Sequence, residues 1–306
     1  MPTSPPLLRV ADLVVDYPEV RAVNGISFAL EPGTVTAFLG PNGAGKTTTI
    51  EVCEGLRRPT SGTVEVFGHD PLHLAAEQRA RIGVMLQSGG IPTSARAVEF
   101  VAHIASLYAN PLDVNALCER LGLHVLGRTS YRRMSGGQKQ TLALACAIVG
   151  RPDLIILDEP TAGLDPQARI NSWELLAELK AAGVTVLLST HYMEEAQAVA
   201  DHVLIADQGA LVAQGPLQEL LVDGQGQLEI STPSTVDISA LQSALGPSFR
   251  VSQRLNSVYV TGDITDEVHR LVVEWCSSHD VIISGLQTNQ HSLEDVFFEL
   301  TGRGLQ

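Results

Sequence analysis

Short apolar runs alternate with helical patterns along the first two-thirds of the chain, and Gly, Pro, Asp or Asn separates most of them. Several runs are apolar throughout, as expected for strands that are buried on both faces of a sheet. One helical pattern begins at Lys46 after a glycine-rich turn, and another covers about residues 166–181 and ends before Gly183. This alternation predicts an α/β fold with strands at residues 8–15, 34–39, 63–66, 82–86, 154–157, 184–189, 202–206 and 210–214.

A helical insert interrupts this alternation at about residues 88–147, where strand signals are few from about residue 94 onward. A second change follows near residues 222–227, where Asp-Gly-Gln-Gly-Gln indicates a linker. The pattern beyond the linker favours a small α+β module of ferredoxin-like order, βαββαβ plus a closing helix. Its elements are expected at residues 227–231, 236–245, 249–254, 257–261, 265–279, 281–286 and 292–300. The sequence therefore predicts two domains, at residues 1–222 and 223–306.

Composition narrows the classes of partner that this chain is expected to bind. An apolar fraction of 44% and a charged fraction of 18% are typical of a globular protein. The net charge of −14 disfavours nucleic acid and anionic lipid as direct partners. Four cysteines without a CxxC pair argue against a thiolate metal site or a disulfide framework and favour a cytosolic setting. No apolar run approaches the roughly 20 residues of a membrane span, so a membrane role would require a partner protein.

One motif carries the clearest chemistry, and it lies between an apolar strand and a helix. Its glycines remove side chains where backbone N–H groups would wrap a phosphate, and the following helix directs its positive end at the anion. Lys46 is expected to reach the β- and γ-phosphates, and the Thr47 hydroxyl is expected to ligate Mg²⁺. Kinases, GTPases, helicases and transport ATPases all carry this motif. It therefore predicts nucleotide binding but not the process that the nucleotide drives. The motif is Gly40-Pro41-Asn42-Gly43-Ala44-Gly45-Lys46-Thr47-Thr48.

Two carboxylates follow the apolar strand at residues 154–157. Asp158 is well placed to hold Mg²⁺, directly or through water. Glu159 is one residue further out, where it could polarise the water that attacks the γ-phosphate. Taken alone, the pair is equally well explained as an acidic turn that closes a strand.

A second glycine-containing helix start offers a further anion-binding site. Met134-Ser135-Gly136-Gly137-Gln138 opens a helix whose first turn offers backbone N–H groups and a hydroxyl but no lysine. This segment resembles the signature motif of the ABC ATPase family, Leu-Ser-Gly-Gly-Gln. Met134 replaces the leucine, and Thr141 stands where many members carry arginine.

Four further positions match the family in the expected order, and the resemblance implies their roles. Gln87 matches the glutamine loop, which contacts Mg²⁺ and the attacking water. Ala162-Gly163-Leu164-Asp165 matches the D-loop, and His191 matches the switch histidine that positions Glu159. Tyr17 matches a stacking platform for adenine, with ordinary packing as the alternative. Taken singly these are weak, since a lone histidine after a strand is often a polar cap and a lone glutamine is uninformative. The fixed order of six motifs is what indicates the family.

The closing segment at residues 292–302 is similar to the end of ATPase subunits from bacterial drug and antibiotic exporters of the daunorubicin-resistance type. The resemblance implies an ATPase that uses ATP and Mg²⁺, pairs head to tail with a second copy, and serves a separate membrane permease at the cytoplasmic face of the membrane. Two alternatives are a soluble ABC ATPase acting on ribosomes or DNA and an ordinary P-loop kinase. A kinase would not need residues 134–138. The acidic net charge disfavours binding to ribosomes or DNA, because both are polyanions.

Overall fold

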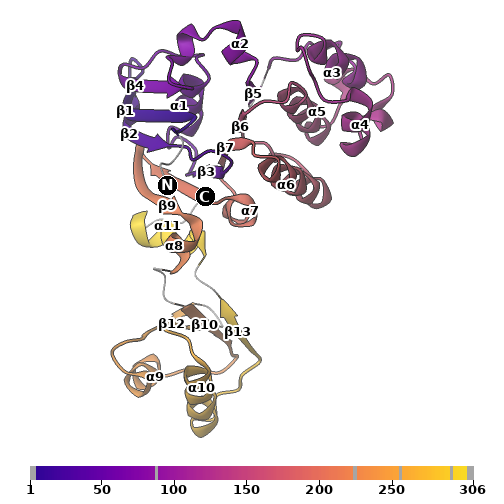
Figure 1. Ribbon diagram of the computed structural model, residues 1–306. Coiled ribbons are helices and arrows are strands. Elements are labelled where there is room, and N and C mark those ends of the chain that lie inside the picture. The colour runs from indigo at the N-terminus through magenta and orange to yellow at the C-terminus, as the bar shows by residue number, and fades with distance from the viewer. Residues whose placement is uncertain (1–4, 87–88, 223–225, 255–256, 290–291, 302–306) are drawn as a thin grey trace. The chain divides into compact units, whose positions relative to one another are not determined.

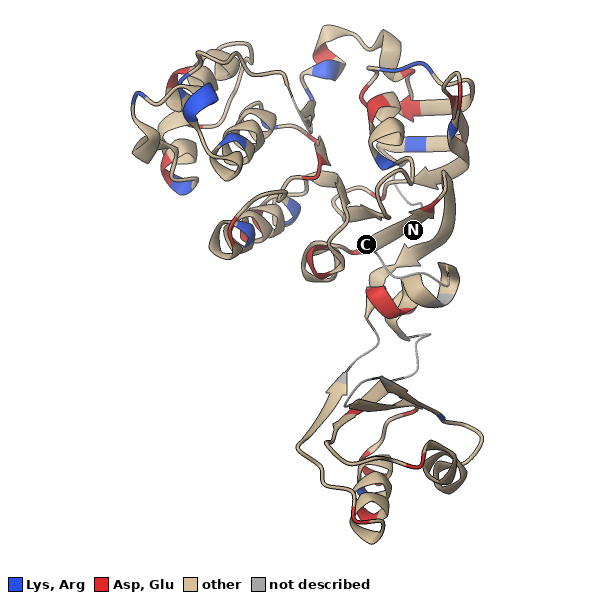
Figure 2. Cartoon of the chain, turned by 180° about the vertical axis from the view of Figure 1, so that it is seen from behind, with Lys and Arg blue, Asp and Glu red and all other residues tan. Residues whose placement is uncertain are grey.

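The computed structural model describes residues 5–86, 89–222, 226–254, 257–289 and 292–301, and the chain divides into two compact units (Figure 1). The first unit extends to Leu217, and the second comprises Gln218 to Gly304, so that the division falls at helix α8 (Leu217–Val222). Each unit has a hydrophobic core of its own. Acidic and basic positions are interspersed over the helices and strands of both units (Figure 2).

A six-stranded sheet in the order β5-β6-β7-β3-β8-β9 forms the centre of the first unit. Strands β5 to β8 of this order run parallel, and β9 runs antiparallel to β8. Every residue of β3, β6 and β7 is buried, which explains their largely apolar sequences. The predicted α/β fold is confirmed. The strands are β3 (Val35–Leu39), β5 (Ile82–Met85), β6 (Leu154–Asp158), β7 (Thr185–Thr190), β8 (His202–Asp207) and β9 (Ala210–Pro216).

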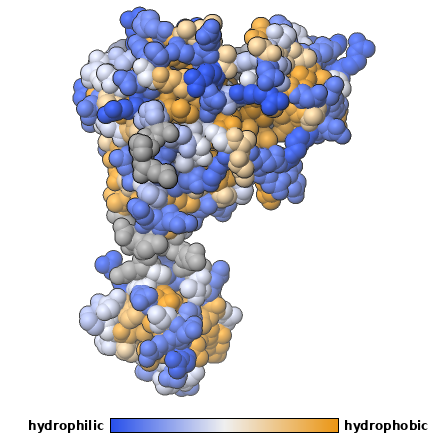
Figure 3. All heavy atoms as spheres, viewed as in Figure 1, coloured by the Kyte–Doolittle hydropathy of each residue, from blue (hydrophilic) through white to orange (hydrophobic). Residues whose placement is uncertain are grey.

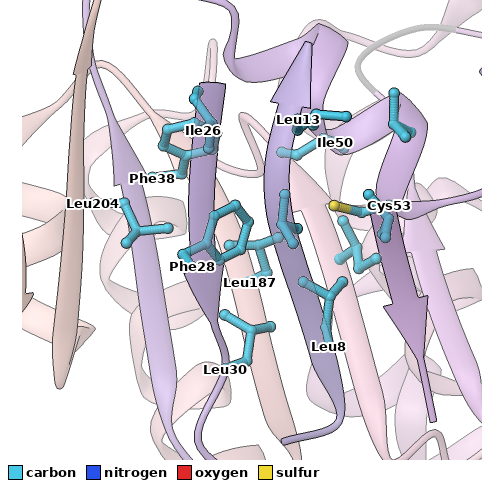
Figure 4. Close-up of a cluster of buried hydrophobic side chains, with 14 of the residues drawn as sticks. Leu8, Leu13, Ile26, Phe28, Leu30, Phe38, Ile50, Cys53, Leu187 and Leu204 are labelled. Carbon is cyan, nitrogen blue, oxygen red and sulfur yellow. The ribbon is translucent and has the colours of Figure 1, made fainter. Parts of the chain in front are cut away.

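A three-stranded antiparallel sheet, β2-β1-β4, packs with helix α1 to form the main hydrophobic core. The core includes Phe28 and Phe38, whose ring centroids lie 6.0 Å apart, and Leu187 from β7 (Figure 4). Fully burying such a side chain contributes about 1.5–3 kcal/mol. The cluster therefore anchors the start of α1 firmly against the sheet. The elements are β1 (Leu8–Asp16), β2 (Arg21–Ala29), β4 (Ser61–Val66) and α1 (Lys46–Cys53).

Helices dominate the predicted insert. Helices α3, α4 and α5 occupy it, and the only β pairing assigned there among the described residues is an isolated bridge between Arg96 and Ser130. The helices of the first unit are α2 (Ala76–Arg79), α3 (Ala97–Ala105), α4 (Val114–Arg120), α5 (Gly136–Ile148), α6 (Pro166–Ala181) and α7 (Met193–Val199), with short 3-10 turns at Pro71–His73, Leu123–Leu126 and Tyr131–Arg133.

The second unit places a four-stranded antiparallel sheet, in the order β11-β12-β10-β13, against α9 and α10. Its core is built from alternate residues of β10 and β12, such as Leu228 and Val260, and from the buried side of α10. The strand expected at residues 281–286 is observed four residues later. The elements are β10 (Gly226–Ser231), α9 (Ile238–Leu245), β11 (Arg250–Arg254), β12 (Ser257–Gly262), α10 (Asp266–Ser278), β13 (Gly285–Asn289) and α11 (Leu293–Thr301).

Candidate nucleotide site

The glycine-rich loop between β3 and α1 has a backbone that only glycines accommodate easily. Gly43 and Gly45 have φ values of 83° and 91°, in the left-handed region that side chains disfavour. A Cβ atom at Gly45 would also lie 2.4 Å from the Ala22 carbonyl oxygen, and one at Gly40 would lie 2.4 Å from that of Ala206. The loop is therefore held against two neighbouring segments of backbone. A loop so fixed fits a phosphate, because its N–H groups need no rearrangement to point at an anion.

Lys46 is the first residue of α1, and its side chain turns back over this loop. The residue is 5% exposed, and its Nζ atom donates to the Gly40 and Pro41 carbonyl oxygens at 2.7 and 3.1 Å. Burial lowers the pKa of the ammonium group, while Glu159 and Asp158 oppose that shift. A positive charge is thus fixed where the loop would hold phosphate.

Asp158 ends β6 and lies in the buried interior beside the loop. Its carboxylate accepts hydrogen bonds from the Ser189 and Thr47 hydroxyls, and burial raises its pKa. The Thr47 hydroxyl and the Asp158 carboxylate are oxygen donors of the kind that Mg²⁺ prefers. Three carboxyl groups crowd this region, because Glu54 is close enough to Asp158 for burial, and then that charge, to raise the pKa of Glu54 to about 8, and Glu159 follows Asp158 directly. A divalent cation would favour the ionised form of these carboxyls, so the oxygen donors present fit Mg²⁺.

Within the described residues, no group of three or more His, Cys, Asp or Glu side chains is arranged to hold a metal ion. A cation at Asp158 and Thr47 would therefore need further ligands from outside the chain. The phosphate oxygens of a nucleotide supply them in sites where Mg²⁺ and a phosphate loop act together.

Glu159 and His191 come together from the ends of adjacent strands. His191 Nδ1 lies 3.2 Å from Glu159 Oε1, and the two side chains are 35% and 13% exposed. The Glu159 backbone has a φ of 51°, and its N–H donates to Ser189 Oγ at 3.0 Å. The carboxylate is thus held in a restricted geometry with one imidazole partner, an arrangement suited to a general base.

Glu159, Lys46 and Thr47 share a pocket of about 300 Å³ with the segment that follows β1. Tyr17 lines its other end at 37% exposure, and its hydroxyl lies 3.4 Å from Thr48 Oγ1. The Arg57 guanidinium covers one face of the Tyr17 ring, at 4.7 Å from the centroid. Asn42, Gly43 and Gly45 also line the pocket. It therefore joins an aromatic side chain to the phosphate loop, as an adenine nucleotide requires.

The signature segment is positioned differently. Ser135 is the N-cap of α5: its hydroxyl accepts from the Gln138 N–H, and the Gln138 side chain accepts from the Ser135 N–H. Gly136 is exposed, and a Cβ atom there would meet nothing within 4 Å. Gly137 packs near Leu164. None of the residues 135–138 lines the nucleotide pocket of the same chain.

The two remaining predicted residues have different outcomes. Asp165 is the N-cap of α6 and accepts from the Ala168 N–H at 2.9 Å, so its carboxylate has a clear structural role. Gln87 lies outside the described residues.

Sequence reasoning assigned no role to Ser189 or Arg57. Ser189 Oγ donates to the Asp158 carboxylate and accepts from the Glu159 backbone N–H. Its only sequence signal is that it precedes Thr190-His191 at the end of a strand. Arg57 is separated from Tyr17 by 40 residues, so only the fold reveals that they are stacked.

The chain matches known proteins in sequence and in fold. Residues 23–162 match the model of the ABC transporter family. The chain is 33% identical to the daunorubicin resistance ATP-binding protein DrrA3 of Streptomyces coeruleorubidus, over 94% of this chain and 93% of that protein. It is 32% identical to the Nod factor export ATP-binding protein I of Ralstonia nicotianae, over 99% and 96%. A solved ATP-binding subunit of an ABC transporter superposes with a TM-score of 0.64 at 28% identity, over 71% of this chain and 92% of that one.

Proposed function

This chain belongs to the ABC transporter family of ATP-binding subunits, and from that premise we propose that it energises an exporter of drugs or other amphiphilic compounds through ATP-driven head-to-tail dimerisation. It is an ATPase, as members of this family are. The single observation that carries the dimeric part of the proposal is the separation of the two anion-binding segments. The glycine loop lines a nucleotide pocket, whereas the exposed signature segment does not line it.

Different residues of the pocket bind ATP and catalyse its hydrolysis. The loop from Gly40 to Thr48 and the Lys46 ammonium bind the triphosphate, and Tyr17 offers its uncovered ring face to adenine. Thr47 and Asp158 would hold Mg²⁺, with Gln87 as a further ligand, and the ion supplies neutralisation of phosphate charge. Glu159 orients and deprotonates the attacking water, and His191 holds the Glu159 carboxylate in place.

The second copy completes each site. A γ-phosphate bound in the loop faces outward, and the start of α5 in a partner chain offers it the Ser135 hydroxyl and the backbone N–H groups of the first helical turn. Gly136 has no contact within its own chain that explains the missing side chain, which supports close approach by another molecule. Hydrolysis removes the charge that both surfaces bind, so the dimer then opens.

A groove of about 250 Å³ on the first unit supports docking of a membrane permease. It is lined by β5, by the segment that flanks Gln87, and by Phe100, Ile104 and Tyr108 of the helical insert. Hydrophobic spheres gather over the part of the unit where α3 and α5 lie (Figure 3). No described helix is long and apolar enough to span a membrane. In this proposal, docking on a permease gives the subunit its place at the cytoplasmic face of the membrane.

The relatives' names favour export. One is named for daunorubicin resistance and another for Nod factor export. No observation favours the alternative, an ABC ATPase that acts on ribosomes or DNA.

The test is to purify tagged Glu159→Gln protein from detergent-solubilised membranes with ATP present and to identify its partners by mass spectrometry. We expect a multi-spanning membrane protein in stoichiometric amount. Recovery of soluble ribosomal or DNA-associated partners alone would leave the ATPase intact and remove the transport proposal.

A further inference from the structure

Glu195, on α7, is a buried carboxylate that the mechanism above does not use. It is completely buried, and neither carboxylate oxygen has a hydrogen-bond partner. Three other buried polar atoms without partners are Thr161 Oγ1, Arg169 Nε and Trp173 Nε1. These five atoms are all but one of the unpartnered buried side-chain polar atoms in the described part of the chain. Such atoms are rare in folded proteins and call for an explanation.

The unpartnered atoms belong to one cluster. The hydroxyls of Thr190 and Thr161 and the indole N–H of Trp173 lie close enough to Glu195 to favour its charged form, as does the Arg169 guanidinium. None of them reaches full hydrogen-bond geometry with the carboxylate. Burial is the larger influence and raises the pKa of Glu195. The cluster therefore places three donors and a cation around one acceptor. A small movement of these side chains would bring several of them into hydrogen-bond geometry with the carboxylate.

Three segments of the site meet at this carboxylate, and two of them carry the catalytic residues. Thr161 follows Glu159 by two residues, and Thr190 directly precedes His191. Arg169 and Trp173 lie on α6, whose N-cap Asp165 ends the D-loop. Thr190 Oγ1 also accepts from the Tyr192 N–H at 3.0 Å, which leaves its own proton available to Glu195.

A second path of contacts runs from the same cluster to the catalytic pair. The Arg169 guanidinium lies 4.6 Å from the Tyr192 ring centroid. That ring packs on His191 with centroids 4.0 Å apart, and His191 Nδ1 is 3.2 Å from Glu159 Oε1. The His191 imidazole thus contacts both Glu159 and the Tyr192 ring, and Arg169 of the cluster packs on that ring.

We propose that Glu195 is a positioning residue for ATP hydrolysis: its buried carboxylate attracts the hydroxyls of Thr161 and Thr190 and so holds the segments that bear Glu159 and His191 close to α6. The inference rests on the catalytic roles proposed above for Glu159 and His191. The alternative is that Glu195 is a neutral core residue with a purely structural role. The two roles differ in what removal of the acceptor does: a positioning role predicts a loss of kcat, whereas a purely structural role predicts a loss of stability with kcat unchanged.

The test compares Glu195→Met with Glu194→Met in the full chain, since Glu194 is its exposed neighbour on α7. Thr161→Val and Thr161→Ser form a second pair, in which only serine retains the hydroxyl. We expect Glu195→Met and Thr161→Val to lower kcat by about tenfold while KM for ATP stays within about twofold. Thr161→Ser and Glu194→Met should remain within about twofold of the parent in both constants. The assays are run below the thermal midpoint of every variant, because removing one partner from a buried polar cluster also destabilises the fold.

A Glu195→Met variant with parental kcat and a lowered thermal midpoint would overturn the inference. If that variant fails to fold, the serine and valine variants of Thr161 decide, and equal kcat in those two would overturn it as well. The Glu159→Gln variant, measured alongside, separates this result from the proposed function. Its full activity would remove the catalytic assignment, whereas its inactivity beside an active Glu195→Met would remove only the role of Glu195.

Discussion

Gly45 and Gly43 lie two residues apart in the phosphate loop and should respond differently to the same substitution. Both have positive φ, but only at Gly45 would a Cβ atom meet backbone, at 2.4 Å from the Ala22 carbonyl oxygen. Around Gly43 there is nothing within 4 Å. We expect Gly45→Ala to lower the free energy of unfolding by about 1–3 kcal/mol more than Gly43→Ala. Urea denaturation of both variants measures the difference, and equal losses would contradict this account of the loop.

Glu54 makes the stability of the folded chain depend on pH. Its pKa is raised to about 8, first by burial and then by the charges of Asp158 and Glu51. A raised carboxyl pKa means that the folded state holds its proton more tightly than the unfolded state does. The associated stability is present below the unfolded pKa of about 4.5 and is lost as pH rises through about 8.

Replacing Glu54 by glutamine removes this titration. We expect the free energy of unfolding of Glu54→Gln to exceed that of the parent by about 1 kcal/mol or more at pH 9, with a much smaller difference at pH 5. Chemical denaturation at the two pH values provides the measurement. A difference that does not grow with pH would show that the Glu54 carboxyl is not desolvated.

At the level of single residues, motif chemistry could be predicted where residue type and spacing are both constrained. The nine residues of the phosphate loop and the Asp158-Glu159 pair are of this kind. Ser189 and Arg57 could not be predicted, because serine and arginine are common and their partners are distant in sequence. Glu195 was missed for the same reason: in the sequence it is one of two adjacent glutamates, and only packing distinguishes it from Glu194.

Among the elements, α5 is the one where a substitution is most clearly expected to reduce activity without reducing stability. Gly136 occupies its first turn, is exposed, and leaves room for a side chain. Alanine favours a helix by up to about 1 kcal/mol over glycine in a helix interior. We therefore expect Gly136→Ala to unfold no more easily than the parent yet to lose most ATPase activity, because a methyl group would intrude where a partner's nucleotide approaches.

Thermal denaturation and steady-state ATPase assays check both halves of this prediction. Ser135→Ala serves as a contrast, since it removes a hydroxyl that caps α5 and should cost about 1 kcal/mol of stability as well. Undiminished activity in Gly136→Ala would argue against a second chain at this helix terminus.

Two strands show where the hydrophobic pattern was insufficient. Strand β2 was not predicted, because Asn24-Gly25 interrupts its apolar residues as a turn would, whereas the structure accommodates them beside register shifts in the β1–β2 pairing. Strand β13 was expected at residues 281–286. The Val281 N–H instead bonds to the Cys276 carbonyl, which continues the end of α10, and pairing with β10 begins at Gly285. In both cases hydrogen-bond partners distant in sequence decided the strand boundaries.

For the whole molecule, we propose that the second unit is a ferredoxin-like regulatory module that stabilises the dimer or modulates turnover. It has its own core, and the described residues that line the nucleotide pocket belong to the first unit. A chain that ends at residue 224 should therefore bind ATP with an affinity within about threefold of the full chain, while its dimerisation or turnover changes. Equilibrium nucleotide binding, sedimentation and ATPase assays test this expectation, and unchanged values in all three would leave the module without either role.

The central claim is that ATP joins two copies of this chain and that Glu159 hydrolyses it, and sedimentation of the Glu159→Gln variant tests that claim most directly. With ATP, the variant should sediment as a dimer and show at least about 100-fold slower hydrolysis, because binding is intact and the base is missing. ADP should leave it monomeric, and adding Gly136→Ala should prevent the dimer. A Glu159→Gln protein that hydrolyses ATP at the parental rate, or that stays monomeric with ATP bound, would contradict the account.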